Sequence, residues 1–220
     1  MIPTDPHRHP VHILLALITL LLSTAAVLAQ QGSSPLKIFI LAGQSNMEGH
    51  GEMTPAFSEG TLEYLVDTDP ATYGNLKDGA TWAEWDDVWI SYKRGGNAPP
   101  LNDNLSAGFG VKATTIGPEL QFGVVLGDYL GEQVLLIKTA WGGKSLYVDF
   151  RPPTSGWSVN PPVSAGDQGY YYQEMLNDVT SVINNLSTYF PGYATIGSYE
   201  LAGFGWHQGW NDRVNGAAVA

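Results

Sequence analysis

Ser45 is the residue whose type and surroundings point most clearly to chemistry. It lies in the pentapeptide Gly-Gln-Ser-Asn-Met at residues 43–47, directly after an apolar run at residues 37–41. A short apolar run closed by glycine is typical of a buried strand. A serine at the carboxyl end of such a strand, where open α/β sheets bind their ligands, is a candidate nucleophile. The alternative is an ordinary turn in which the Ser and Asn side chains bond nearby backbone groups.

Two further polar loops favour the nucleophile over the turn. One follows an apolar run and carries Gly142 and Gly143, whose backbone N–H groups no side chain obstructs; the other carries the amides of Gln208 and Asn211. Acyl transfer needs a nucleophile together with hydrogen-bond donors aimed where an oxyanion develops. We therefore predict an acyl-transfer site made by three loops. The neighbouring polar side chains expected to contact substrate are Gln44, Asn46 and His207.

The elements that must position these loops alternate between strands and helices. The expected strands are residues 37–41, 87–92, 134–137 and 199–204. One helix is expected to begin at residues 117–119 and to end at Gly131, and a long amphipathic helix is expected over residues 170–190. This alternation predicts a layered α/β domain with a mainly parallel sheet, so that the three loops meet at one sheet edge. Residues 48–115 are expected to form a long, mostly irregular excursion over the active face.

The first 29 residues have the composition of a secretory signal peptide. Arg8 and three histidines precede an apolar run at residues 13–22, and small residues then lead to Ala29. The run is shorter than the about 20 residues that span a bilayer, which favours cleavage after Ala29 over an uncleaved membrane anchor. We expect a secreted or periplasmic protein that meets the membrane only through this segment, with residues 36–220 as its one domain.

Composition excludes several other classes of function. The chain has no cysteine, and therefore neither disulfides nor thiolate chemistry. A net charge of −11 without a Lys/Arg cluster makes a nucleic-acid partner a poor expectation. Residues 143–145 resemble the end of a phosphate-binding loop, but Lys138 stands where that motif requires glycine. No histidine cluster indicates zinc, so neither a metal nor a cofactor is predicted.

The three loops resemble three sequence blocks of the SGNH hydrolase superfamily, and within it those of sialate O-acetylesterase-like carbohydrate esterases. The pentapeptide is similar to the nucleophile block, with Ser45 in the nucleophile position. Residues 141–145 resemble the glycine block whose N–H groups line the oxyanion hole, and residues 206–212 resemble the W-x-Q-G-x-x-D block. Either Gln208 or Asn211 fits as the amide donor. The resemblance covers residues 36–212. It implies a three-layer α/β/α, flavodoxin-like fold and a serine esterase that acts on O-acetylated carbohydrates.

One element of that superfamily is missing. Its base and orienting acid form an Asp-x-x-His pair near the carboxyl end, and this sequence contains no such pair. We therefore expect a domain incomplete at its C-terminus, with an exposed sheet edge and weak or no catalysis. Neither His50 nor His207 is expected to replace the base, because a triad depends on geometry. Two alternatives stay open: a non-catalytic carbohydrate-binding remnant, and a GDSL-type lipase or thioesterase.

Overall fold

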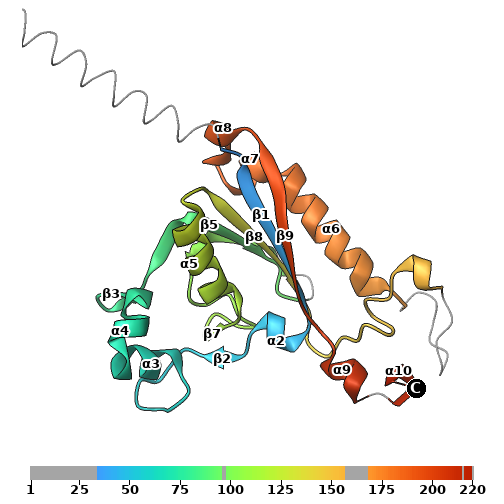
Figure 1. Cartoon of the computed structure of the whole chain (residues 1–220), viewed down its shortest axis with the longest axis horizontal. Helices are drawn as coiled ribbons and strands as arrows, with labels where there is room; N and C mark the ends of the chain where they lie inside the picture. Colours follow the sequence, from blue (N-terminus) through green and yellow to red (C-terminus); the bar gives the residue numbers. More distant parts are fainter. Residues whose placement is uncertain (1–33, 96–97, 157–167, 215, 220) are drawn as a thin grey trace, which may run out of the picture.

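The computed structural model describes residues 34–95, 98–156, 168–214 and 216–219 (Figure 1). The predicted signal peptide at residues 1–29 lies outside the described residues. Within the described ranges, no helix has both the length and the apolar character needed to cross a membrane.

A five-stranded sheet in the order β6-β5-β8-β1-β9 forms the middle of the domain (Figure 1). The strands are β1 (Leu36–Gly43), β5 (Glu84–Tyr92), β6 (Leu101–Ser106), β8 (Val134–Ala140) and β9 (Tyr199–His207). The pairs β5–β8, β8–β1 and β1–β9 are parallel, whereas β6 pairs antiparallel to β5. The predicted mainly parallel sheet is therefore confirmed, and each of the four expected strands is present with somewhat longer bounds.

The register of the sheet brings the three polar loops together. Gly43, the last residue of β1, pairs with Ala140 of β8 on one side and with His207 of β9 on the other. All three strands therefore end at the same level of the same edge. Because β1 is the middle strand of the three, the loop that carries Ser45 lies between the glycine loop and the amide loop.

Helices cover both faces of the sheet, as expected for three layers. The helix α5 (Glu119–Leu130) packs on one face and α6 (Tyr170–Asn184) on the other (Figure 1). Successive strand residues point to opposite faces. Thus Leu136 joins the core under α5, while Leu135 and Ile137 join the core under α6.

The amphipathic helix expected over residues 170–190 is divided in the structure. It ends at Asn184, and α7 (Leu186–Tyr189) and α8 (Tyr193–Ile196) continue the segment. Asn185 leaves helical geometry with φ −123° and ψ 21°, and its side-chain amide donates to the Ser181 carbonyl at 2.8 Å. An asparagine that bonds the backbone competes with helix formation, and the spacing of apolar residues does not reveal such a break.

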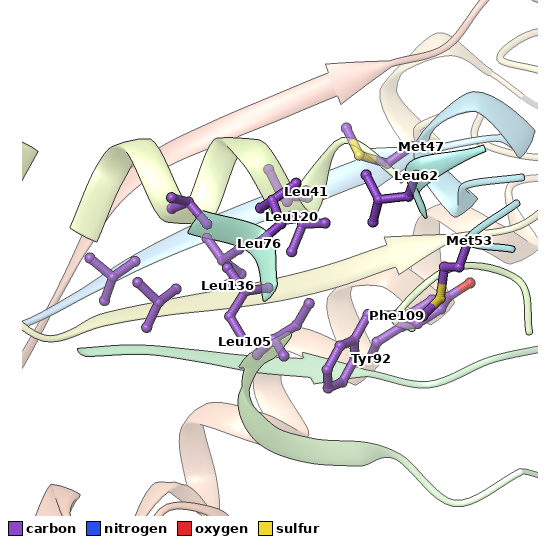
Figure 2. Close-up of a cluster of buried hydrophobic side chains, with 14 of the residues drawn as sticks. Leu41, Met47, Met53, Leu62, Leu76, Tyr92, Leu105, Phe109, Leu120 and Leu136 are labelled. Atoms are coloured by element: carbon purple, nitrogen blue, oxygen red, sulfur yellow. The ribbon is translucent and has the colours of Figure 1, made fainter. Parts of the chain in front are cut away.

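The excursion at residues 48–115 contains more regular structure than expected. Besides β5 and β6 it includes β2 (Gly51–Glu52), α3 (Leu62–Thr68), α4 (Pro70–Tyr73), η1 (Gly74–Leu76), β3 (Lys77–Asp78), β4 (Thr81–Trp82) and, at its end, β7 (Thr115–Ile116). Its Met53, Leu62 and Leu76 are buried in the same cluster as Leu41 and Leu136 (Figure 2). This part of the chain therefore belongs to the core on the α5 side of the sheet.

The strand β9 lies at an edge of the sheet and is incompletely covered. Its side chains on the α6 side that remain exposed are Tyr199, Leu201, Phe204 and Trp206. An edge strand with apolar side chains and free backbone groups is a template for association with another chain. The exposed edge that the sequence leads us to expect is thus present in the described part of the domain.

Candidate active site

Ser45 lies at the turn from the middle strand to a short helix, α2 (Ser45–Glu48). Its side chain is partly exposed and that of Asn46 is exposed. Met47, by contrast, is buried in the core cluster beside Leu41 and Leu62 (Figure 2). The pentapeptide is thus anchored from beneath by Met47, while Ser45 is presented at the carboxyl edge of the sheet.

The glycine loop after β8 approaches Ser45 closely. A Cβ atom at Gly142 would lie 2.7 Å from the Glu48 Oε2 atom and 4.0 Å from the Ser45 Cβ atom, so a side chain here would have to displace the Glu48 carboxylate. Among the described residues, the backbone N–H groups of Gly142 and Gly143 have no hydrogen-bond acceptor. Both groups are therefore available to an oxygen atom bound near Ser45.

Two carboxylates hold the glycine loop in place. Asp212 accepts hydrogen bonds from the backbone N–H groups of Leu146 at 2.9 Å and Tyr147 at 2.7 Å. Asp149 accepts from the Ser145 backbone N–H at 2.7 Å and from its hydroxyl at 2.9 Å. Charge-assisted bonds of this kind are stronger than neutral ones. Asp149 thus stabilises its own loop, and Asp212 joins the glycine loop to the amide loop.

Both candidate amide donors reach the glycine loop. Asn211 donates its side-chain amide to the Gly143 carbonyl at 2.6 Å, and Gln208 donates to the Lys144 carbonyl at 2.7 Å. A primary amide nitrogen carries two hydrogens, so each retains one for a further acceptor. The Asn211 Nδ2 atom also lies 4.0 Å from the Cβ position of Gly143. Asn211 is therefore placed against one of the two predicted oxyanion glycines, and Gln208 against the residue that follows it.

Gln44 connects the first loop to the third from a buried position. Its side-chain oxygen accepts from the Asn211 backbone N–H at 3.2 Å, and its own backbone N–H donates to the His207 carbonyl at 3.3 Å. With a relative exposure of 1%, it offers substrate little surface. The contacts of Gln44 are therefore those of a residue that joins two loops, which the sequence does not reveal.

A cavity of about 190 Å³ opens beside Ser45. It is lined by Gln44, Asn46, His207, Gln208, Gly209, Trp210 and Arg213, and so brings together the three residues expected to contact substrate. Trp210 as a residue is 57% exposed, and the Arg213 guanidinium lies over its ring at 5.1 Å from the centroid. An exposed aromatic face next to amide, imidazole and guanidinium groups can stack on a polar ring and hydrogen-bond to it.

No imidazole contacts the Ser45 hydroxyl in the described part of the chain. The Ser45 Oγ atom accepts only a long hydrogen bond, 3.5 Å, from the Gln44 amide. His50 lies 3.5 Å from Glu48 Oε2, while His207 lines the cavity. The described residues thus supply a serine and hydrogen-bond donors, without a base bonded to the serine.

Sequence reasoning missed a buried ion pair beneath the site. Lys138 of β8 and Glu119 of α5 lie 2.7 Å apart, and both side chains are fully buried. The available signals were a lysine inside an otherwise apolar strand and an acid after Gly117-Pro118. Neither signal identifies the other residue as its partner.

Comparison with known proteins gives a family match and several distant structural similarities, of which two are described here. Residues 35–219 match the family model described as "Carbohydrate esterase, sialic acid-specific acetylesterase". A search of curated proteins gave no match. A solved structure of a protein from Arabidopsis thaliana is 16% identical with a TM-score of 0.44, and 83% of this chain aligns with 60% of that one. A carbohydrate acetylesterase from Xanthomonas citri is 13% identical with a TM-score of 0.40, and 83% of this chain aligns with 35% of that one.

Proposed function

Because the chain belongs to the family of carbohydrate esterases described as sialic acid-specific acetylesterases, we propose that it is a serine esterase that removes O-acetyl groups from carbohydrates. The observation that carries the proposal is the strand order β8-β1-β9, which places Ser45 between a glycine loop and an amide loop. This is the arrangement that acyl transfer requires, with a nucleophile beside donors for an oxyanion.

In the proposed reaction, the Ser45 Oγ atom attacks the acetyl carbonyl carbon, the bond from that carbon to the sugar oxygen breaks, and the serine proton ends on the departing sugar oxygen. The oxygen of the tetrahedral intermediate is held by the backbone N–H groups of Ser45 and of Gly143 or Gly142, together with a side-chain amide. Water then attacks the acetyl-enzyme, which releases acetate and regenerates Ser45. The alcohol proton needs an acceptor, and a serine without an imidazole partner is weakly activated. We therefore expect slow acylation of this chain.

We assign the amide role to Asn211 in preference to Gln208. The Asn211 Nδ2 atom lies against Gly143, and its backbone N–H bonds Gln44, the neighbour of Ser45. Gln208 instead points to the carbonyl of Lys144, one residue further along the loop. A donor contributes to the transition state only if it lies within hydrogen-bond distance of the oxyanion, which favours the residue nearer to Gly143.

The cavity beside Ser45 is the proposed sugar site. Trp210 would stack on a sugar face, while Asn46, His207 and Arg213 would bond its hydroxyl or carboxyl groups. The substrate would be reached outside the cytoplasm, since the leader-like sequence at residues 1–29 supports export.

A comparison of ester substrates tests the proposal. We expect the purified chain to release acetate from O-acetylated sugars and 4-nitrophenyl acetate. The Ser45→Ala variant should release it no faster than spontaneous hydrolysis in buffer. Faster cleavage of long-chain 4-nitrophenyl esters would favour the lipase or thioesterase alternative. Sugar binding without any Ser45-dependent hydrolysis would favour the non-catalytic binding protein.

A further inference from the structure

Lys138 is a buried lysine whose three hydrogen-bond acceptors come from three different segments. Its Nζ atom donates to the Glu48 carbonyl at 2.8 Å, to the Phe109 carbonyl at 2.7 Å and to Glu119 Oε2 at 2.7 Å. An ammonium group has three donors, so every one of them is used. The lysine therefore ties the end of α2 and the loop at Phe109 to the first turn of α5.

The first of these contacts is made to the helix that carries Ser45. Glu48 is the last residue of α2 and Ser45 is the first. A helix of four residues is little more than one turn, with a rise of about 1.5 Å per residue. A displacement of the Glu48 carbonyl is therefore transmitted to Ser45, because no flexible segment separates the two ends.

A second contact holds the same end of α2. Gly49 and Gly117 approach so closely that a Cβ on either one would overlap the backbone of the other. The Gly117 N–H donates to Glu119 Oε1 at 2.8 Å, so the acid that pairs with Lys138 also fixes this approach. The segment at residues 117–119 thus contacts the end of α2 through backbone atoms and not through a flexible side chain.

Burial of the Lys138–Glu119 ion pair costs desolvation free energy, which argues against a role in stability alone. Burial lowers the pKa of Lys138, and the Glu119 carboxylate acts in the opposite direction. The Tyr92 ring lies 4.5 Å from the ammonium, and Arg94 and Glu48 are the other charged groups nearby. Buried ion pairs seldom exceed well-packed apolar residues in stability, whereas their directional bonds select one geometry.

We propose that Lys138 and Glu119 are positioning residues, which fix the C-terminal end of α2 and thereby hold Ser45 at the edge of the sheet for attack. The proposal rests on the assignment of Ser45 as the nucleophile. Both side chains are buried and neither lines the cavity beside Ser45, so their effect on the reaction is exerted through α2.

The test replaces the pair without leaving a buried charge. The double variant Lys138→Met/Glu119→Gln keeps side-chain volume. Lys37→Met is the control, because it removes partly exposed ion pairs with Glu200 and Glu132 from the start of β1. Hydrogen exchange is measured at the α2 amides of Met47, Glu48 and Gly49, which bond the Gln44 and Ser45 carbonyls. Esterase kcat and KM are measured on the same samples.

We expect exchange at these three amides to rise about tenfold in the double variant, with strand amides unchanged, as for a local opening. We expect kcat to fall by about 100-fold at constant KM, since a displacement of about 1 Å costs that much. Lys37→Met should change neither. If the double variant does not fold, Glu119→Gln alone should show the same local rise to a smaller extent.

Two results would overturn the proposal. One is a folded double variant whose α2 amides exchange at the wild-type rate. The other is exchange that rises equally in all strands, which would indicate a role in general stability. If the parent chain hydrolyses no ester while α2 exchange still rises locally, the positioning inference stands and the proposed esterase activity of this chain fails.

Discussion

The side-chain amide of Asn211 donates a 2.6 Å hydrogen bond to the carbonyl oxygen of Gly143, although 68 positions separate the two residues. This bond joins the amide loop to the glycine loop directly beside Ser45. The Gly143 carbonyl is thereby engaged, while the Gly143 N–H group has no acceptor among the described residues. The donors of the proposed oxyanion hole thus position one another.

Replacement of the two amides should separate their roles. We expect Asn211→Ala to lower kcat by about 100-fold, the usual loss for one oxyanion donor, and Gln208→Ala to lower it less. The measurement is steady-state hydrolysis of 4-nitrophenyl acetate. A larger loss for Gln208→Ala would reverse the assignment.

A methyl group at Gly142 should disturb the site without unfolding the protein. In Gly142→Ala the new Cβ would lie 2.7 Å from Glu48 Oε2, so either Glu48 or the loop must move. We expect a lower kcat and an unchanged circular dichroism spectrum. Gly74→Ala is the control, because its Cβ would meet only Pro70 at an ordinary 3.7 Å. Equal kcat values for the two variants would contradict the close approach of Glu48 and Ser45 at Gly142.

Loss of the Asp212 carboxylate should destabilise the glycine loop. Asp212→Ala removes two bonds to backbone N–H groups, each worth about 1.5–3 kcal/mol when the acceptor is charged; because Asp212 is partly exposed, the lower end applies. We expect the free energy of unfolding in urea to fall by about 3 kcal/mol. Asp69→Ala, which loses one exposed bond to Thr72, should cost less. Comparable losses would show that Asp212 does not hold the loop.

Asp178 should make stability depend on pH. Burial raises its pKa, while the Lys93 ammonium acts against this and Glu174 adds to it. The folded state therefore favours the protonated acid more than the unfolded state does, and the stability from this group is lost as pH rises through the raised pKa. We expect Asp178→Asn to be more stable than the parent at neutral pH, with the difference shrinking in acid. Urea unfolding at several pH values measures this, and a difference that grows in acid would contradict it.

The apolar face of β9 should promote self-association. Leu201 and Phe204 are 58% and 55% exposed on an edge strand. We expect Leu201→Lys to shift the protein towards monomer in size-exclusion chromatography, because a charge on an edge strand opposes pairing. A parent chain that elutes entirely as a monomer would contradict this.

The sequence predicts that the three loops meet because parallel strands place their carboxyl ends at one sheet edge. It cannot predict which contacts hold them there. Gln44 is adjacent to Ser45 in the chain, yet its side chain bonds the backbone of Asn211, a contact that depends on the pairing of β1 with β9. The hydrogen bonds from Lys138 to Glu48 and Glu119 form only when β8 and α5 pack together. Local patterns also miss the break at Asn185, where a side-chain bond ends the helix.

The reactivity of Ser45 towards a fluorophosphonate probe, located by mass spectrometry of the modified peptide, tests the central assignment most directly. We expect the adduct on Ser45, formed faster in the folded chain than in urea and more slowly in Asn211→Ala. Modification of Ser45 at the rate of the unfolded chain, or of another residue in its place, would contradict a nucleophile held between the glycine and amide loops.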